Sequence, residues 1–164
     1  MSDPIDLRPP IDLPPGYSTP DEPVSPFTIR QEVNWRDMDA FAHVNNAVYL
    51  SWFENVRFHY FGLIGLRQLQ QTEGIGPILA RAEVDYRAPV EFPDTLLVNN
   101  RTAEIGRTSF VLENAVWSTS QQREVARGRF VIVTVDYRAG ATKTPIPEAV
   151  RARILELDTP RQRS

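Results

Sequence analysis

Apolar side chains recur with the period of an α-helix in the first half of the chain. One broad helical face carries Val48, Tyr49, Trp52, Phe53, Val56, Tyr60 and Leu63. Leu50, Phe58 and Phe61 are apolar on the other side, which leaves only a thin polar strip. A helix this apolar is buried on most of its surface. We therefore expect it to form the centre of the core.

Alternation of apolar and polar residues predicts strands elsewhere in the chain. One strand is expected before the helix, at residues 27–35. Four more are expected after it, at residues 78–86, 95–104, 109–118 and 125–137. Short helices are expected at residues 66–71 and, with proline in its first turn, at residues 147–157. This order is typical of an α+β fold in which a single antiparallel sheet wraps around one long central helix.

Residues 1–26 differ in composition from the rest of the chain. They are dense in proline and contain more acids than bases. Proline lacks an amide donor and fixes φ, so this segment cannot form a helix or an interior strand. We expect a flexible arm at residues 1–26, a single folded domain at residues 27–157 and a C-terminal tail at residues 158–164. An arm that contacts a partner subunit is the alternative.

Composition excludes several broad classes of function. The formal net charge of -3 gives no general attraction to nucleic acid or to an anionic membrane. The absence of cysteine excludes disulfides, cysteine zinc sites and a thiol nucleophile. No apolar run reaches the ~20 residues that span a bilayer, and the N-terminus lacks the pattern of a secretory signal. We expect a cytoplasmic protein with no membrane span.

Common motifs of catalysis and cofactor binding are missing from the sequence. It has no Gly-x-Ser-x-Gly nucleophile elbow and no glycine-rich phosphate loop. The two histidines, His43 and His59, do not have the spacing of metal ligands. We therefore expect neither a metal ion nor an organic cofactor.

One polar run, residues 37–46, places two acids, a histidine and two asparagines directly before the apolar helix. Asparagine is a favoured N-cap, so the helix is expected to begin at this asparagine pair. The first amides of a helix lack partners and can stabilise a carbonyl oxygen as it becomes an oxyanion. A carboxylate beside these amides could attack the carbonyl carbon directly, or orient and deprotonate a water. A thiol has a pKa of about 8.5, so a thiolate leaves near neutral pH without an acid to protonate it. One carboxylate and one oxyanion site are therefore enough to cleave a thioester.

Residues 33–50 and 53–57 closely resemble the 4-hydroxybenzoyl-CoA thioesterase family, and most of all its acyl-CoA thioesterase branch. The signature is Asp-x-x-x-His-x-Asn-Asn followed by an aromatic-rich helix. Residues 84–90 and 131–136 also fit, so the resemblance covers about residues 27–157. It implies the hot-dog fold and hydrolysis of an acyl-CoA thioester to the free acid and CoA. It also implies a homodimer or homotetramer with CoA bound near the subunit interfaces.

The resemblance assigns three candidate catalytic residues. Asp39 matches the catalytic carboxylate, which acts as nucleophile or general base in different members. Asn46 falls where a backbone amide at the helix start polarises the thioester carbonyl. His43 could orient a water or the acyl group, or it could bond a loop carbonyl as a structural residue.

Three further residues are candidates for binding the substrate. Asn45 lies at the expected helix start, where it is also expected to act as a cap. Arg87 and Arg129 could bind the phosphates of CoA, since guanidinium binds phosphate well. For either arginine alone, a solvated surface position is the more common interpretation.

Other polar residues have structural interpretations. Asp37 is expected to form the turn by accepting hydrogen bonds from nearby amides. His59 falls within the apolar face of the helix and is interpreted as a core histidine. Glu54 and Arg57 are expected to pair at i,i+3 on the polar strip.

Two other functions stay open from the sequence. A hot-dog hydratase or dehydratase also pairs an aspartate with a histidine, but with one more residue between them and after a Gly-Asp-x-Asn-Pro pattern that is absent here. A non-catalytic acyl-CoA-binding module is the second, and the presence of Asp39 only mildly disfavours it. The sequence reveals neither the length of the acyl chain nor whether CoA or acyl carrier protein is the donor.

Overall fold

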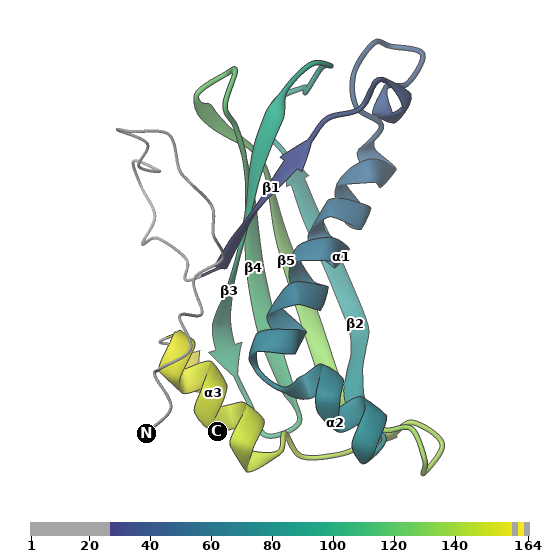
Figure 1. Ribbon diagram of the computed structural model, residues 1–164, viewed down its shortest axis with the longest axis vertical. Helices are drawn as coiled ribbons and strands as arrows, with labels where there is room; N and C mark the ends of the chain where they lie inside the picture. Colours follow the sequence, from purple (N-terminus) through teal and green to yellow (C-terminus); the bar gives the residue numbers. More distant parts are fainter. Residues whose placement is uncertain (1–26, 159–160, 163–164) are drawn as a thin grey trace.

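The computed structural model describes residues 27–158 and 161–162 of the chain. Its sheet has the strand order β1-β3-β4-β5-β2, and neighbours along this path are antiparallel (Figure 1). These strands are β1 Phe27–Glu32, β2 Ile75–Tyr86, β3 Thr95–Ile105, β4 Ser109–Ser118 and β5 Arg123–Asp136. Two short strands, β6 Thr142–Lys143 and β7 Arg161–Gln162, pair with β5 and β3. The predicted arm at residues 1–26 lies outside the described residues.

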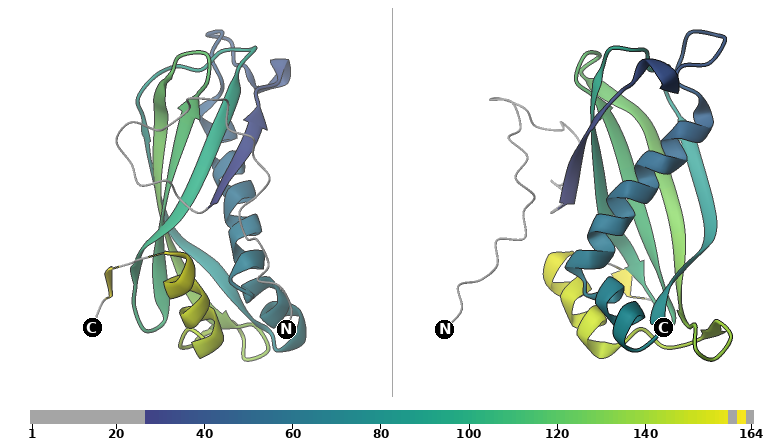
Figure 2. Two further views of the ribbon diagram at one scale, coloured as in Figure 1. Left: turned by 60° about the vertical axis from the view of Figure 1, so that its left-hand side comes forward. Right: turned by 45° about the vertical axis from the view of Figure 1, so that its right-hand side comes forward.

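One long helix, α1 Asn46–Leu63, lies along one face of the curved sheet (Figures 1 and 2). Two shorter helices, α2 Leu66–Thr72 and α3 Glu148–Leu157, lie near the C-terminal end of α1. The loop that precedes α1 is at the opposite end of the molecule. The prediction of an α+β fold with a single curved sheet is confirmed, and the sheet is antiparallel except where the short strand β7 pairs with β3.

Aromatic side chains of α1 form much of the core between the helix and the sheet. Phe53 contacts Phe130 of β5 with ring centroids 5.1 Å apart, and Phe61 contacts Phe110 of β4 at 6.3 Å. Phe53 and Phe130 are completely buried. Burying one such side chain stabilises the fold by roughly 1.5–3 kcal/mol. The same contacts fix the direction of α1 and therefore the place of its N-terminus.

The helix is less fully buried than its sequence predicts. Leu50 is 43% exposed and Phe58 is 51% exposed, so α1 buries one face rather than most of its surface within a single chain. The prediction that His59 is a core histidine is wrong, because this side chain is exposed. Its ring lies at the edge of the buried face, 6.1 Å from the ring of Phe27 on β1.

Arg57 is buried although the sequence places it on the polar strip. The residue is only 6% exposed, and its guanidinium lies 4.4 Å above the ring of Phe130. The predicted ion pair between Arg57 and Glu54 is not formed within the described residues, and the guanidinium makes this cation–π contact instead. Burial lowers the pKa of Arg57 to about 10, and the nearby Glu54 charge acts against that change. The guanidinium therefore stays charged in the core.

The first strand is shorter than predicted, because a turn interrupts the alternating pattern. β1 ends at Glu32, and a 3-10 helix, η1 Trp35–Asp37, follows it. The amide of Asn34 donates a 2.8 Å hydrogen bond to Oδ2 of Asp37 and starts this turn. Trp35, the last residue of the predicted strand, therefore lies in the turn and is 74% exposed. The turn-forming role predicted for Asp37 is confirmed.

The remaining elements occur where the sequence predicts them, with small shifts at their ends. The short helix expected at residues 66–71 is α2. The strand richest in β-branched residues, β5, is an interior strand paired with β4 and β2. At α3 the predicted proline is displaced by one position, because Pro147 is the N-cap rather than a residue of the first turn.

A buried polar cluster joins the end of α3 to the core. The hydroxyl of Tyr60 and the amide of Thr102 each donate a 2.8 Å hydrogen bond to Oδ2 of Asp158. The hydroxyls of Tyr60 and Thr102 also form a 2.6 Å hydrogen bond. Burial is the main cause that raises the pKa of Asp158, and these hydrogen bonds act against it. Asp158, which belongs to the predicted C-terminal tail, thus connects α1, β3 and α3.

Replacing Asp158 with asparagine should raise the melting temperature at neutral pH. A raised pKa means that the folded state binds the proton more tightly, so the ionised carboxylate destabilises the fold as pH rises. Asparagine keeps an oxygen acceptor without the charge. Its advantage over the wild type should therefore shrink as the pH is lowered from 7 towards about 4 and the aspartate takes up a proton. Thermal unfolding across this pH range measures the difference.

The matched variant is Asp158→Ala, which removes the acceptor as well as the charge. It leaves the Tyr60 hydroxyl and the Thr102 amide without this partner and should cost about 1–3 kcal/mol. If the asparagine and alanine variants are equally destabilised at neutral pH, the ionised carboxylate stabilises the fold and the argument from burial is wrong.

Candidate active site

The loop before α1 is a narrow hairpin that holds Asp39 opposite His43. Met38 and Val44 form an isolated antiparallel bridge. The amide of Asp39 donates to the carbonyl of His43 at 2.8 Å, and the amide of Asn45 donates to the carbonyl of Asp37 at 2.8 Å. Directly opposite residues of an antiparallel pair project to the same side. The hairpin therefore places Asp39 directly opposite His43 along the backbone, and His43 lies three positions before the first residue of α1.

The carboxylate of Asp39 is oriented by its own turn. Its Oδ1 accepts a 2.8 Å hydrogen bond from the amide of Phe41, which fixes the side chain relative to the hairpin tip. Within the described part of the chain, the other oxygen, Oδ2, accepts no hydrogen bond. The bond to Oδ1 also sets the direction of this second oxygen. Because Asp39 is only partly buried, Oδ2 can be reached by a ligand or a water.

In the first turn of α1, the backbone amide of Asn46 has no partner in the part of the chain that the structure describes. Asn45 is the N-cap, as predicted, and its Oδ1 accepts a 2.9 Å hydrogen bond from the amide of Ala47. Its carbonyl accepts a 2.9 Å hydrogen bond from the amide of Val48. The amide of Asn46 forms no hydrogen bond with any described residue. Asn46 therefore presents an N–H group at the positive end of a long helix.

His43 has a neighbour that the sequence did not indicate. Its Nε2 lies 3.8 Å from Oε1 of Glu91, and both side chains are largely exposed. This places the imidazole beside an acid rather than on a loop carbonyl. In the sequence, Glu91 comes directly after the segment at residues 84–90. The amide of Val44 donates a 2.8 Å hydrogen bond to the carbonyl of Val90, and this bond holds the neighbouring Glu91 close to the hairpin.

Exposed aromatic side chains surround this loop. Phe41 at the hairpin tip is 81% exposed, and Trp35 packs edge-on against Phe92 with ring centroids 5.9 Å apart. The amide of Phe92 is 3.3 Å from the sulfur of Met38. Apolar surface of this kind beside polar groups is typical of ligand sites and subunit interfaces.

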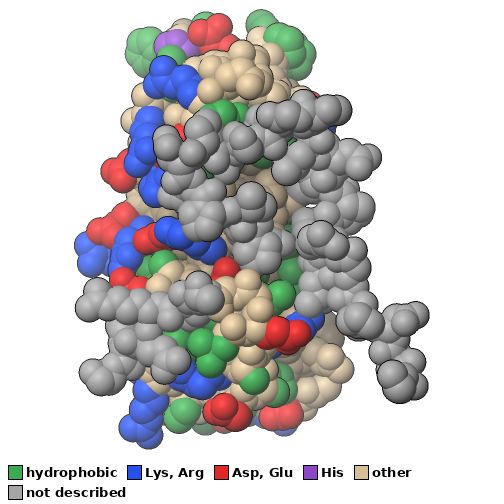
Figure 3. Space-filling model, turned by 90° about the vertical axis from the view of Figure 1, so that its left-hand side faces the viewer, with side chains coloured by type: hydrophobic (Ala, Val, Ile, Leu, Met, Phe, Trp, Pro, Cys, Tyr) green, Lys and Arg blue, Asp and Glu red, His purple; other side chains and the backbone are tan. Residues whose placement is uncertain are grey.

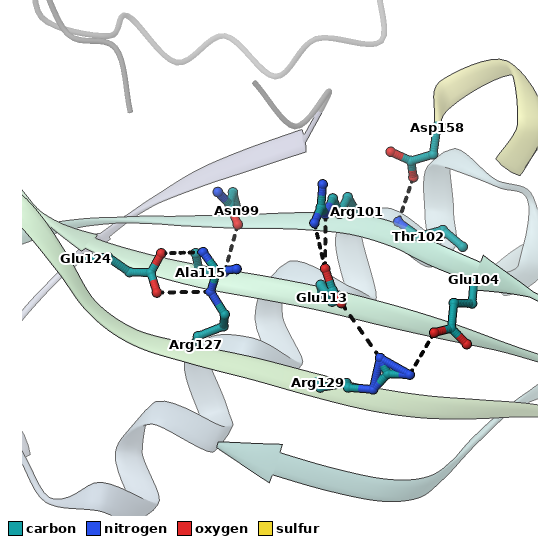
Figure 4. Close-up of polar contacts among 10 residues, drawn as sticks. All are labelled: Asn99, Arg101, Thr102, Glu104, Glu113, Ala115, Glu124, Arg127, Arg129 and Asp158. Carbon is teal, nitrogen blue, oxygen red and sulfur yellow. Dashed lines mark hydrogen bonds and ion pairs between the residues drawn. The ribbon is translucent and has the colours of Figure 1, made fainter. Parts of the chain in front are cut away.

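Arg129 lies on the face of the sheet that points away from α1. Its neighbour Phe130 contacts the helix, and successive strand residues point to opposite faces. Its guanidinium binds Glu104 at 3.0 Å and lies 3.7 Å from Glu113 (Figure 4). Basic and acidic side chains also lie side by side on the face of the molecule shown in Figure 3. The structure thus separates Arg129 from the loop that holds Asp39.

Arg87 lies closer to the start of α1, one residue after the end of β2. Its Nη1 is 2.7 Å from Oε1 of Glu124, and the same carboxylate binds Arg127 (Figure 4). Both candidate arginines are therefore engaged by acids. Their binding of CoA phosphates stays a prediction.

The described residues contain no group of three histidine, aspartate or glutamate side chains that could hold a metal ion. Among the same residues, no helix has the length and apolar character needed to cross a membrane. The cytoplasmic location stays a prediction from the sequence.

Comparison with known proteins gives a consistent family. The model of the thioesterase-like superfamily matches residues 33–154. A thioesterase from Thermus thermophilus, solved with coenzyme A and zinc, is 37% identical, and the match covers 79% of this chain and 97% of that one with a TM-score of 0.69. The long-chain acyl-CoA thioesterase FadM of Escherichia coli is 23% identical over 101 residues, which cover 62% of this chain and 76% of FadM.

The fold is shared more widely than the sequence. A 1,4-dihydroxy-2-naphthoyl-CoA thioesterase from Synechocystis is 21% identical, covers 82% of this chain and 98% of its own, and has a TM-score of 0.71. At this identity the likeness concerns the fold alone. The family match, in contrast, extends from the end of β1 through most of α3. The chain therefore belongs to the thioesterase-like superfamily.

Proposed function

We propose that this protein hydrolyses acyl-CoA thioesters to the free acid and CoA, using Asp39 and the amide of Asn46. The thioester carbonyl oxygen accepts a hydrogen bond from the Asn46 amide, which stabilises the negative charge that develops on attack. The free oxygen of Asp39 either attacks the carbonyl carbon or deprotonates the attacking water. The bond between carbon and sulfur then breaks, and CoA leaves as a thiolate. Where water attacks, this step releases the free acid directly, and where Asp39 attacks, a water then hydrolyses the acyl–Asp39 anhydride to the free acid and restores the carboxylate.

The observation that carries the proposal is the unpartnered Asn46 amide. Asn45 accepts hydrogen bonds from the amides of Ala47 and Val48, through its side chain and its carbonyl, and within the described residues the Asn46 amide has no partner. An uncommitted donor at a helix N-terminus, next to an oriented carboxylate, matches the two needs of thioester cleavage. The family and the CoA-containing relative from Thermus thermophilus support CoA as the carrier.

Release of free thiol from a panel of acyl-CoAs tests the function. We expect turnover with at least one acyl class, and aliphatic and aromatic acyl groups should both be included. The same acyl groups on acyl carrier protein identify the preferred carrier. Hydration of an enoyl-CoA without thiol release would favour the hydratase alternative, and tight acyl-CoA binding without turnover would favour the binding module.

We also propose that the protein is a homodimer or a homotetramer. β2 ends the order of the described sheet and pairs only with β5, so one long edge has unpaired backbone groups. Residues 79–83 of this strand are exposed, and exposed strand edges are usually paired or covered. A second copy of β2 would cover the edge and would bring further residues to the loop that holds Asp39.

Light scattering should therefore give a mass near two or four times the 18.7 kDa of the chain. This mass should be found at a micromolar concentration of the protein, the range in which such an enzyme is assayed. A mass equal to one chain would contradict the dimer, and it would require the active site to be complete in a single subunit.

A further inference from the structure

The hydroxyl of Tyr86 is bonded to the first residue of α1. This side chain stands at the end of β2, and its Oη donates a 2.9 Å hydrogen bond to the carbonyl of Asn46. The two residues are 40 positions apart in sequence. In an α-helix this carbonyl is also the acceptor for the amide four residues later. The Tyr86 hydroxyl therefore provides a second, tertiary hydrogen bond at the helix start.

The contacts around Tyr86 leave its hydroxyl little freedom. Its ring packs edge-on against Tyr49 of α1, with centroids 5.1 Å apart and planes at 85°. Its partner on β5 is Ala126, whose short side chain leaves room for the ring on the helix side of the sheet. Directly after Tyr86, the amides of Arg87 and Ala88 both donate to the carbonyl of Val125. Burial raises the pKa of Tyr86, so the phenol stays protonated as a donor.

We propose that Tyr86 is a positioning residue that fixes the first turn of α1 and thereby the direction of the Asn46 amide. The carbonyl and the amide of Asn46 belong to two adjacent peptide groups, which are joined at the Cα of Asn46. Holding one of these groups against β2 restricts the rotation of the other. The inference rests on the proposed thioesterase function, in which the Asn46 amide must point at the carbonyl oxygen as charge develops there. Donors aligned in advance need no reorganisation during the reaction.

The matched comparison uses Tyr86→Phe and Tyr137→Phe in the full-length protein. Tyr137 also donates from its hydroxyl to a backbone carbonyl of β2, that of Pro77, at 2.8 Å. The two tyrosines are similarly exposed, at 45% and 42%. Tyr137 bonds the other end of β2, away from the helix start. Each substitution removes one hydroxyl and keeps the ring.

With the best acyl-CoA of the panel, Tyr86→Phe should lower kcat about tenfold, since a small misplacement of a catalytic group is costly. Its KM should stay within about twofold, because the amide acts mainly in the transition state. Hydrogen exchange followed by NMR should show faster exchange in the first turn of α1. Tyr137→Phe should match the wild type in kcat, KM and exchange at that turn.

The proposal is overturned if Tyr86→Phe keeps the kcat of the wild type. It is also overturned if kcat falls while exchange in the first turn of α1 is unchanged, because the hydroxyl then acts by another route. An inactive wild type would instead contradict the proposed function. In that case the exchange comparison between the two variants still decides whether the hydroxyl fixes the turn.

Discussion

Asparagine in place of Asp39 should lower kcat at least about 100-fold, the lower end for loss of a positioned acid or base. Asparagine can neither attack as a carboxylate nor take a proton from water. Its side-chain oxygen can still accept the hydrogen bond from the Phe41 amide, so the hairpin should keep its shape. Substrate binding should survive, since the Asn46 amide is unchanged. Thiol release gives kcat, and calorimetry with a non-hydrolysable acyl-CoA thioether gives the affinity.

The control is Asp37→Asn, at the other acid of the same run. Asp37 accepts from the amide and the side chain of Asn34, and an amide oxygen at this position can keep the shorter of these bonds. This variant should keep most of the activity. If Asp37→Asn is inactive and Asp39→Asn is active, the roles within the hairpin are reversed. If both variants keep full activity, the carboxylate mechanism fails.

The sequence predicted the fold well where one periodic pattern dominates a segment. The long apolar face of α1 and the alternating strands β3, β4 and β5 each specify one element and one buried side. It failed where a local hydrogen bond overrode the pattern. Trp35 continues the alternation of β1, but the bond between Asn34 and Asp37 turns the chain first. Only tertiary packing reveals that Arg57 is buried, because its partner is the face of Phe130.

The candidate site divides in the same way. The order of Asp39, His43 and the asparagine pair before an apolar helix is visible in sequence, and so is the N-cap. The geometry of Asn45 decides which backbone amides at the helix start it binds and which it does not. The spacing of residues in the sequence does not predict this. Tyr86 and Glu91 reach the loop only because β2 and the segment after it run beside the helix start. The sequence signal for Tyr86 was limited to its place in a segment that resembles the family.

The packing between α1 and the sheet depends on one glycine that no sequence pattern singles out. Gly128 is a buried residue of β5, opposite Asn114 of β4 and Val84 of β2. A Cβ at this position would lie 2.4 Å from Cε2 and 2.8 Å from Cζ of Phe130. It would also lie 3.3 Å from Cε2 of Phe53. The ring of Phe130 therefore occupies the space that any side chain at Gly128 would need.

Gly128→Ala should destabilise the protein by about 1–3 kcal/mol, the usual cost of overfilling a well-packed core. Phe130 must move to admit the methyl group, and this ring contacts both Phe53 and the guanidinium of Arg57. Gly62→Ala is the control, because the nearest atom to its Cβ is Cδ of Arg67 at 3.8 Å, an ordinary contact. Alanine should stabilise α1 there by about 0.5–1 kcal/mol. Urea unfolding should thus shift the two midpoints in opposite directions. Equal midpoints for Gly128→Ala and the wild type would mean that Phe130 can move without loss of packing.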